Sequence, residues 1–300
     1  MKKLILCLLI ALICFSGCKT EKLYEDSGKI KIVTTAFPIY DFAKNICGDN
    51  AEVSMLVPPG SDSHSFEPTP NDIITLIDSD LFIYIGGENE AWVSDILDSA
   101  GLDSDKTLSF ENMIETDEEE HEDVHEHDEH IWTSVKNASE ICNAITQKIS
   151  SIDSVNAAQY NNNFSEYNKK LIELDEKFTE IVENALRKTV VFGDRFPFLY
   201  FVKDYDLEYF SAFPGCAAET EPSAATVAEL TDKIKSENIP VVFHIEFSNE
   251  NVADILCEAT GAEKMLFHSC HNVTQQQITA GIGYIELMTK NAENLKEALN

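Results

Sequence analysis

The sequence predicts an α/β protein of two Rossmann-like lobes, each a mainly parallel sheet with flanking helices, joined by one long rigid helix. Short apolar strands alternate with helix-length segments over residues 30–87 and again after residue 188, and this alternation is typical of parallel sheets. Between these regions, residues 139–186 contain neither Gly nor Pro. The 300 residues, 44% of them apolar, suffice to build two cores.

The N-terminal residues are typical of an export signal. Residues 1–17 combine two lysines, an apolar run and small residues before Cys18, and the run is too short for a comfortable membrane span. Residues 15–18 resemble a bacterial lipobox, although Phe15 stands where Leu is usual. We therefore expect a signal peptide at 1–17, acylation of Cys18 and a polar tether over 18–29; the alternative is an ordinary cleaved signal with an incidental cysteine.

The N-terminal lobe is expected over residues 30–150. Its strands are predicted at 29–37, 51–58 and 81–87, with helices at 38–47 and 70–80 between them. Residues 115–130 interrupt this pattern with ten Asp or Glu and no Lys or Arg, a composition too charged to bury. This acidic stretch, which also holds four histidines, is expected to be a mobile excursion.

The connecting helix is predicted from a 3.6-residue apolar period over residues 151–187, with Phe164, Tyr167, Leu171 and Leu174 among the recurring positions. Its part from 154 to 186 would span roughly 45–50 Å at 1.5 Å per residue, which exceeds the width of one small domain. We therefore expect it to join the lobes.

The C-terminal lobe is expected over residues 188–300, where the alternation resumes. Strands are predicted at 188–194, 207–213, 240–247 and 264–269, and helix-like segments at 196–205, 225–236, 251–260 and 275–299. No sequence repeat accompanies the similarity of the two lobes.

The net charge of −31 argues against binding to nucleic acid or to an anionic membrane surface, and it suits a cationic ligand. Three of the eight cysteines lie at or before Cys18, and the other five are widely spaced with no CxxC pattern. No disulfide can be assigned, and Cys47, Cys142 and Cys257 are expected to be small buried residues of helices.

The chain has eight histidines: His64, His121, His125, His127, His130, His244, His268 and His271. Nearly all of them fall at the carboxyl end of a predicted strand or just beyond it. In open α/β sheets, ligands bind at that edge. His64 follows two prolines and a glycine, which stiffen a turn and can aim one side chain. Taken alone, a loop histidine of this kind is more often an ordinary surface residue.

The stretch GSDSHSFEPTPNDIITLIDSDLFIYIGGENEAWV closely resembles the signature of the zinc and manganese solute-binding lipoproteins of bacterial ABC importers. HIW at 130–132, AETEPSAATVAELTDKIK and EATGAEK with the C-terminal YIELMTKNAENLKEAL agree with the same family. The resemblance covers essentially the whole chain after the tether, and it implies the two-lobed fold described above.

The resemblance also implies a ligand set. His64 takes the first ligand position and His130 the second. The family has His or Glu after the strand that follows the long helix; here Asp194 is the candidate, and its alternative role is a helix cap or a partner of Arg195. For the fourth ligand the family supplies an Asp beyond the last strand. This chain offers His271 first, His268 second and Cys270 third, while Cys216 is expected to be buried without a ligand role.

Other residues have supporting roles in this interpretation. Glu67 and Glu246 are expected to hydrogen-bond ligand imidazoles, and His244 to be a supporting or structural histidine within its strand. His121, His125 and His127 have two open interpretations, low-affinity metal capture or a solvated segment without function.

The predicted function is therefore capture of a divalent metal on the extracellular face of the cytoplasmic membrane, with delivery to the permease and ATPase of an ABC importer. Two or three imidazoles favour Zn²⁺ as the bound ion, with Mn²⁺ as the alternative. We expect a monomer held to the membrane only by its lipid, with no nucleic-acid partner and no enzymatic activity. The rival interpretations are a secreted zinc hydrolase, for which no HExxH motif is present, and a surface adhesin with incidental metal binding.

Overall fold

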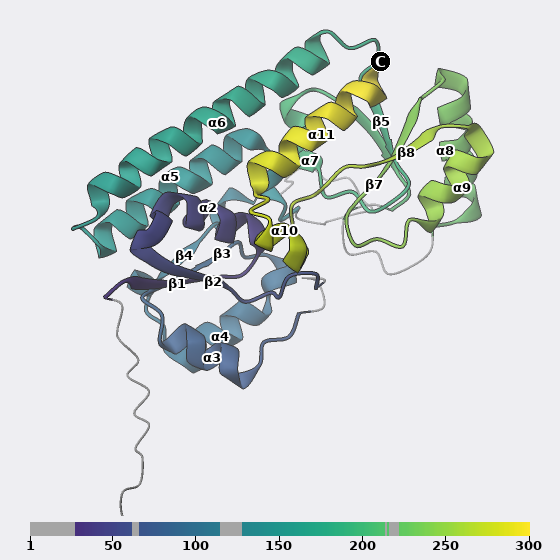
Figure 1. Ribbon diagram of the computed structural model, residues 1–300. Helices are drawn as coiled ribbons and strands as arrows, with labels where there is room; N and C mark the ends of the chain where they lie inside the picture. Colours follow the sequence, from purple (N-terminus) through teal and green to yellow (C-terminus); the bar gives the residue numbers. More distant parts are fainter. Residues whose placement is uncertain (1–27, 62–65, 115–127, 214, 216–221) are drawn as a thin grey trace, which may run out of the picture.

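The computed structural model describes residues 28–61, 66–114, 128–213, 215 and 222–300. They form two four-stranded sheets with the orders β2-β1-β3-β4 and β6-β5-β7-β8, and every strand pair is parallel. The strands are β1 (Ile30–Thr34), β2 (Ala51–Met55), β3 (Leu81–Tyr84), β4 (Thr107–Ser109), β5 (Thr189–Phe192), β6 (Glu208–Ser211), β7 (Val241–His244) and β8 (Glu263–Leu266). The predicted fold class is confirmed (Figure 1).

Helices cover both faces of the first sheet. Successive side chains of a strand point to opposite faces, so Ile32 joins the core under α2 (Phe37–Cys47) while Val33 joins the core under α3 (Pro70–Ile77) and α4 (Trp92–Ala100). Helix α3 begins with a capping box, in which Thr69 and Asp72 satisfy each other's backbone N–H groups. The sequence prediction did not include α4 or β4.

The two lobes are joined by a helical hairpin. Helix α5 (Val135–Ile152) is followed by α6 (Ala157–Glu183), which lies along α5 and leads into β5 (Figure 1). With 27 residues, α6 spans about 40 Å at 1.5 Å per residue. The connecting helix therefore begins six residues later and ends four residues earlier than the predicted range of 151–187.

The C-terminal lobe has the same layered arrangement. Its helices are α7 (Leu199–Asp204), α8 (Ala224–Glu237), α9 (Asn251–Thr260), α10 (Gln275–Thr279) and α11 (Tyr284–Leu299). The single final helix predicted over 275–299 is wrong, because the chain turns between α10 and α11. Gly281 there has a φ of +70°, and a Cβ at Gly283 would lie 2.8 Å from an oxygen of Asp41.

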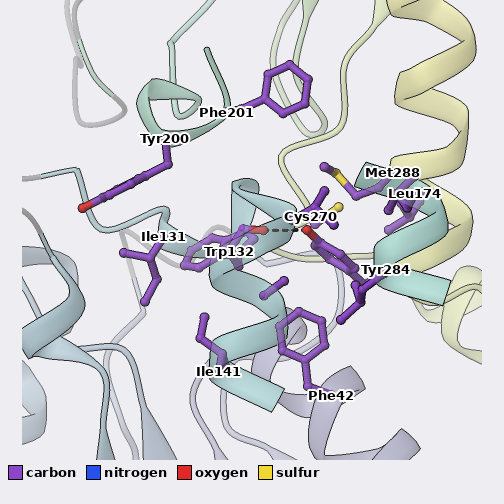
Figure 2. Close-up of a cluster of buried hydrophobic side chains, with 14 of the residues drawn as sticks. Phe42, Ile131, Trp132, Ile141, Leu174, Tyr200, Phe201, Cys270, Tyr284 and Met288 are labelled. Atoms are coloured by element: carbon purple, nitrogen blue, oxygen red, sulfur yellow. Dashed lines mark hydrogen bonds between the residues drawn. The ribbon is translucent and has the colours of Figure 1, made fainter. Parts of the chain in front are cut away.

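One hydrophobic core runs through the joint between the lobes. Figure 2 shows Phe42 of α2, Ile141 of α5 and Leu174 of α6 near Tyr284 and Met288 of α11. Helix α11 contacts α6 as well as α2 of the first lobe. Because side chains from both lobes share this core, a wide separation of the lobes would expose apolar surface to water.

The described cysteines behave largely as expected. Cys47 and Cys142 are buried in α2 and α5, Cys257 is half-buried in α9, and none of the four described cysteines forms a disulfide. Within the described part of the chain, no helix combines the length and the apolar character that a membrane span requires.

Candidate metal centre

The structure describes some of the predicted site residues and not others. His130, Asp194, His244, His268, Cys270, His271, Glu67 and Glu246 lie within the described residues. His64, Cys18, Cys216 and the three loop histidines His121, His125 and His127 lie outside them. The description that follows is therefore built on His130 and His271.

His130 is buried on a short segment that precedes α5. Its ring Nδ1 lies 2.6 Å from Oδ1 of Asp128, and its backbone N–H donates to the same oxygen at 2.9 Å. Burial alone would raise the pKa of Asp128, but the imidazole of His130 and the backbone donors of His130 and Leu199 hold it below its ordinary value. An ionised carboxylate only accepts, so Nδ1 carries the proton and Nε2 is the nitrogen with a lone pair for a metal.

His271 lies in the turn after β8, and its ring faces that of His130. The two ring centroids are 5.0 Å apart with an interplanar angle of 86°, and both rings lie about 5 Å from the indole of Trp132. Two imidazoles that share one tetrahedral Zn²⁺ through Zn–N bonds of about 2.0–2.1 Å have centroids roughly 5 Å apart. The observed spacing fits a shared ion.

Glu246 holds the turn that carries His271. Its Oε2 accepts from the Ser269 backbone N–H at 2.8 Å, and its Oε1 accepts from the Ser269 hydroxyl at 2.6 Å and from the His271 backbone N–H at 3.2 Å. Glu246 therefore holds the turn through two backbone N–H groups and the Ser269 hydroxyl, and its Oε1 also lies 3.5 Å from Nδ1 of His268.

The segments of the two histidines are also joined directly. The Trp132 indole N–H donates to the Ser269 carbonyl at 2.8 Å. The Tyr284 hydroxyl donates to the Trp132 carbonyl at 2.7 Å, and Figure 2 shows this second bond. These bonds connect the segment before α5 with the turn after β8 and with the start of α11. The positions of the two imidazoles are therefore set by one buried network.

His268 and Cys270 have structural roles in the same turn. The Nδ1 of His268 accepts the Cys270 backbone N–H at 3.0 Å, and Asn291 bonds both the N–H and the carbonyl of His268. Cys270 is fully buried, and Figure 2 shows it beside Met288 and Tyr284 in the apolar core. Burial raises the pKa of the Cys270 thiol well above its ordinary value, which opposes the thiolate that a metal needs. Neither position favours a ligand role.

Asp194 follows β5, as predicted, and is buried. Its Oδ1 accepts from the Arg195 backbone N–H at 2.8 Å and its Oδ2 from the Ile245 backbone N–H at 3.1 Å, so the carboxylate connects the ends of β5 and β7. Nothing in this geometry joins it to the two imidazoles. Its ligand role stays a prediction.

Gly193, directly before Asp194, has no room for a larger ligand residue. A Cβ there would lie 2.5 Å from the Cα of Ala253. A His or Glu at this position would therefore require the backbone of α9 to move.

Two further residues were predicted to have supporting roles, His244 and Glu67. His244 has its Nδ1 3.1 Å from the Ile245 carbonyl and 3.8 Å from Glu250, and Glu67 is exposed before α3. Among the residues that the structure describes, no three His, Cys, Asp or Glu side chains gather as a metal site. The described residues therefore bring two imidazoles together, those of His130 and His271.

A small hollow adjoins the imidazole pair. It is lined by Ala36, Val57, Ile85, Glu90, Trp92, Glu129, Trp132 and His271. Burial raises the pKa of Glu90 to about 7, an effect that its donors Gly86 and Ile85 partly offset and the charge of Glu129 increases. Sequence reasoning gave no role to Glu90, Glu129 or Asp128. For Asp128, the available signal was a carboxylate two residues before His130.

The chain matches known proteins over nearly its whole length. The family model for the periplasmic zinc-uptake complex component A, ZnuA, matches residues 32–298. The high-affinity zinc uptake system protein ZnuA of Bacillus subtilis (strain 168) is 31% identical over 98% of this chain and 95% of its own length. The zinc-binding lipoprotein AdcA of Streptococcus pneumoniae is 30% identical over 97% of this chain, which spans only 60% of that longer protein.

Solved structures of zinc-binding and laminin-binding proteins have a similar fold. The Zn(II)-bound ZnuA-like domain of S. pneumoniae AdcA aligns with a TM-score of 0.75 at 29% identity, covering 91% of this chain and 99% of that domain. The laminin-binding protein Lmb of Streptococcus agalactiae, described as a bifunctional protein with adhesin and metal-transporting activity, aligns with a TM-score of 0.75 at 26% identity, covering 90% of this chain and 100% of Lmb. The matched family consists of zinc-uptake components, which are binding proteins and not enzymes. By its family match, its relatives and its two-lobed fold, this chain belongs to the ZnuA family of zinc-binding proteins.

Proposed function

We propose that this chain captures Zn²⁺ outside the cytoplasm and delivers it to an ABC importer. The observation that carries the proposal is the pair of His130 and His271 rings, whose centroids lie 5.0 Å apart although 141 residue positions separate them in the sequence. Two imidazole nitrogens favour Zn²⁺ over Mn²⁺, which prefers oxygen ligands. The zinc-binding relatives named above support the same ion.

The proposed ligands are His130 and His271 from the described residues, with His64 and Asp194 completing the set. Residues from both lobes would then hold one ion, and the network through Trp132 and Glu246 would keep the two imidazoles in place. An ion held by pre-positioned ligands is bound more tightly, because little side-chain entropy is lost on binding.

Metal analysis by native mass spectrometry tests this proposal. Wild-type protein from residue 19 onward should retain one Zn²⁺ through dialysis, and His130→Ala and His271→Ala should each lose it. His244→Ala is the matched control, because this half-buried imidazole of the second lobe pairs with Glu250 and should not matter for zinc. Retention of tightly held zinc by both site variants would contradict the proposal.

The cellular setting belongs to the proposal as well. Cys18 would carry the lipid that holds a monomer to the outer face of the cytoplasmic membrane, where the importer's permease and ATPase receive the ion. Relatives described as lipoproteins support this placement. Mass spectrometry of the membrane-extracted chain should show a diacylated N-terminal cysteine, and Cys18→Ala should release the chain from the membrane.

Adhesion is a second candidate function, favoured by the structural similarity to the laminin-binding protein of S. agalactiae. If this chain binds laminin independently of metal capture, binding should persist in a variant with His64 and His130 both changed to Ala. If laminin binding is absent from the wild-type protein, this candidate is excluded.

A further inference from the structure

The two carboxylate oxygens of Asp128 have partners in different lobes. Oδ1 accepts from the Nδ1 and the backbone N–H of His130. Oδ2 accepts from the backbone N–H of Leu199 at 3.2 Å, and Leu199 is the first residue of α7 in the second lobe. The Asp128 side chain is only 10% exposed, so water competes little for these bonds. One carboxylate therefore connects the ring of a proposed ligand to the backbone of the opposite lobe.

This arrangement fixes the imidazole in two ways. With both oxygens occupied, the carboxylate cannot rotate without losing a bond to one lobe or the other. Because Oδ1 only accepts, it also selects the tautomer of His130 in which Nδ1 is protonated and Nε2 has its lone pair. A carboxylate on the far nitrogen makes an imidazole a stronger metal donor.

The same segment has a second bond to α7 that does not involve the histidine. The Ser134 hydroxyl donates to Oδ2 of Asp204, the last residue of α7, at 2.6 Å. Ser134 therefore fastens the segment to the second lobe, as Asp128 does, but Asp204 bonds no imidazole in this arrangement. The two bonds allow the effect of the carboxylate on His130 to be separated from the effect of fastening the segment.

We propose that Asp128 is a positioning residue, which couples the tautomer and orientation of His130 to the seating of the second lobe and so strengthens zinc binding without touching the ion. This inference rests on the proposed function, in which His130 is a zinc ligand. Asp128 belongs to the acidic, histidine-rich stretch at 115–130, but this role is assigned to Asp128 and not to the other acidic residues of that stretch.

Asp128→Asn is the test variant. An amide has one acceptor oxygen, so it can serve the His130 ring or the Leu199 N–H but not both, and its NH₂ group then faces another donor. Competition titration with a zinc chelator should show a 10- to 100-fold loss of affinity, the range typical when a partner of a metal-bound imidazole is removed. Ser134→Ala is the control: it should lower the unfolding midpoint yet keep the zinc affinity within about twofold of wild type.

A second measurement does not depend on zinc. In the metal-free wild-type protein, ¹⁵N NMR of the imidazoles should show His130 protonated at Nδ1 and not at Nε2, and Asp128→Asn should give a mixture of the two tautomers. If wild-type His130 is protonated at Nε2, the inference is overturned even if the variant does not fold. Equal losses of zinc affinity in Asp128→Asn and Ser134→Ala would also overturn the inference, because attachment of the segment before α5 to α7 would then explain both losses.

Failure of the proposed function would look different. Weak zinc binding by the wild-type protein would refute zinc capture, whereas the NMR result would still report whether Asp128 sets the His130 tautomer. Tight wild-type binding with unchanged affinity in a folded Asp128→Asn variant would refute only the positioning role.

Discussion

The buried carboxyl group of Asp41 makes the stability of the joint between the lobes depend on pH. It lies where α2, α6 and α11 meet, and its Oδ2 accepts from the Tyr167 hydroxyl at 3.0 Å and from the Tyr284 backbone N–H at 3.1 Å. Burial raises the pKa of Asp41 to about 6 from 3.8; the donors partly offset this effect, and the charge of Glu286 increases it. Asp41→Asn replaces this group with an amide of similar shape that does not titrate.

The sign and size of the effect follow from linkage. The folded protein holds the Asp41 proton more tightly than the unfolded chain, so the neutral carboxyl group stabilises the fold below about pH 4. That contribution is lost as the pH rises through about 6, and two pK units correspond to about 3 kcal/mol. At pH 4 the carboxyl group of the unfolded chain is already partly ionised, so the free energy of unfolding of Asp41→Asn minus that of wild type should increase by about 2.5 kcal/mol between pH 4 and pH 7.

The assay is urea unfolding of the metal-free proteins at several pH values, with a chelator present because bound zinc would add its own pH dependence. An unpaired NH₂ group of the new amide lowers the stability of the variant equally at every pH. The test is therefore how the difference in unfolding free energy between variant and wild type changes with pH. Tyr167→Phe is the companion variant: it removes a donor that lowers the Asp41 pKa, so its stability should fall more steeply with pH than that of wild type. A difference between Asp41→Asn and wild type that stays constant from pH 4 to pH 7 would refute the reasoning.

Three further predictions concern the site. Trp132→Phe removes the indole hydrogen bond to Ser269 and should lower the free energy of unfolding by about 1 kcal/mol or more in denaturant titrations. An unchanged unfolding midpoint would contradict the conclusion that this bond stabilises the contact between the two segments. Gly87→Ala should destabilise by roughly 1–3 kcal/mol, because its φ is +87° and a Cβ would clash with the Glu129 carboxyl group. A variant as stable as wild type in thermal unfolding would contradict this prediction. Glu246→Gln leaves one acceptor oxygen for the three donors of the turn that carries His271, so zinc release should be faster in stopped-flow chelation. Zinc release at the wild-type rate would show that the turn keeps its conformation without the second carboxylate oxygen.

Much of the fold follows from local pattern. The four central strands, β1, β3, β5 and β7, are apolar runs that are largely buried in the structure, because burial on both faces selects continuous apolar residues. The edge strands β2, β6 and β8 were also predicted, although they are partly exposed. The elements that were missed are short: β4 has three residues and α4 (Trp92–Ala100) has nine. The break between α10 and α11 was missed because isolated glycines are tolerated in helical patterns. Here Gly283 is required by the close approach of Asp41, a contact between distant parts of the chain.

The site was less predictable, because its decisive contacts are between distant residues. His130 and His271 could be named from motifs, but their spacing depends on Trp132 reaching Ser269 and on Glu246 holding the turn. The position of Asp128 two residues before His130 is a local signal, but its bond to the Leu199 backbone N–H of the other lobe cannot be inferred from the sequence.

The measurement that tests the central claim most directly is anomalous diffraction at the zinc edge from crystals of the zinc-loaded protein. The proposed site predicts one strong peak within bonding distance, about 2.0–2.1 Å, of Nε2 of both His130 and His271. A peak bonded to neither imidazole, or zinc bound through Nδ1 of His130 with Asp128 displaced, would contradict it.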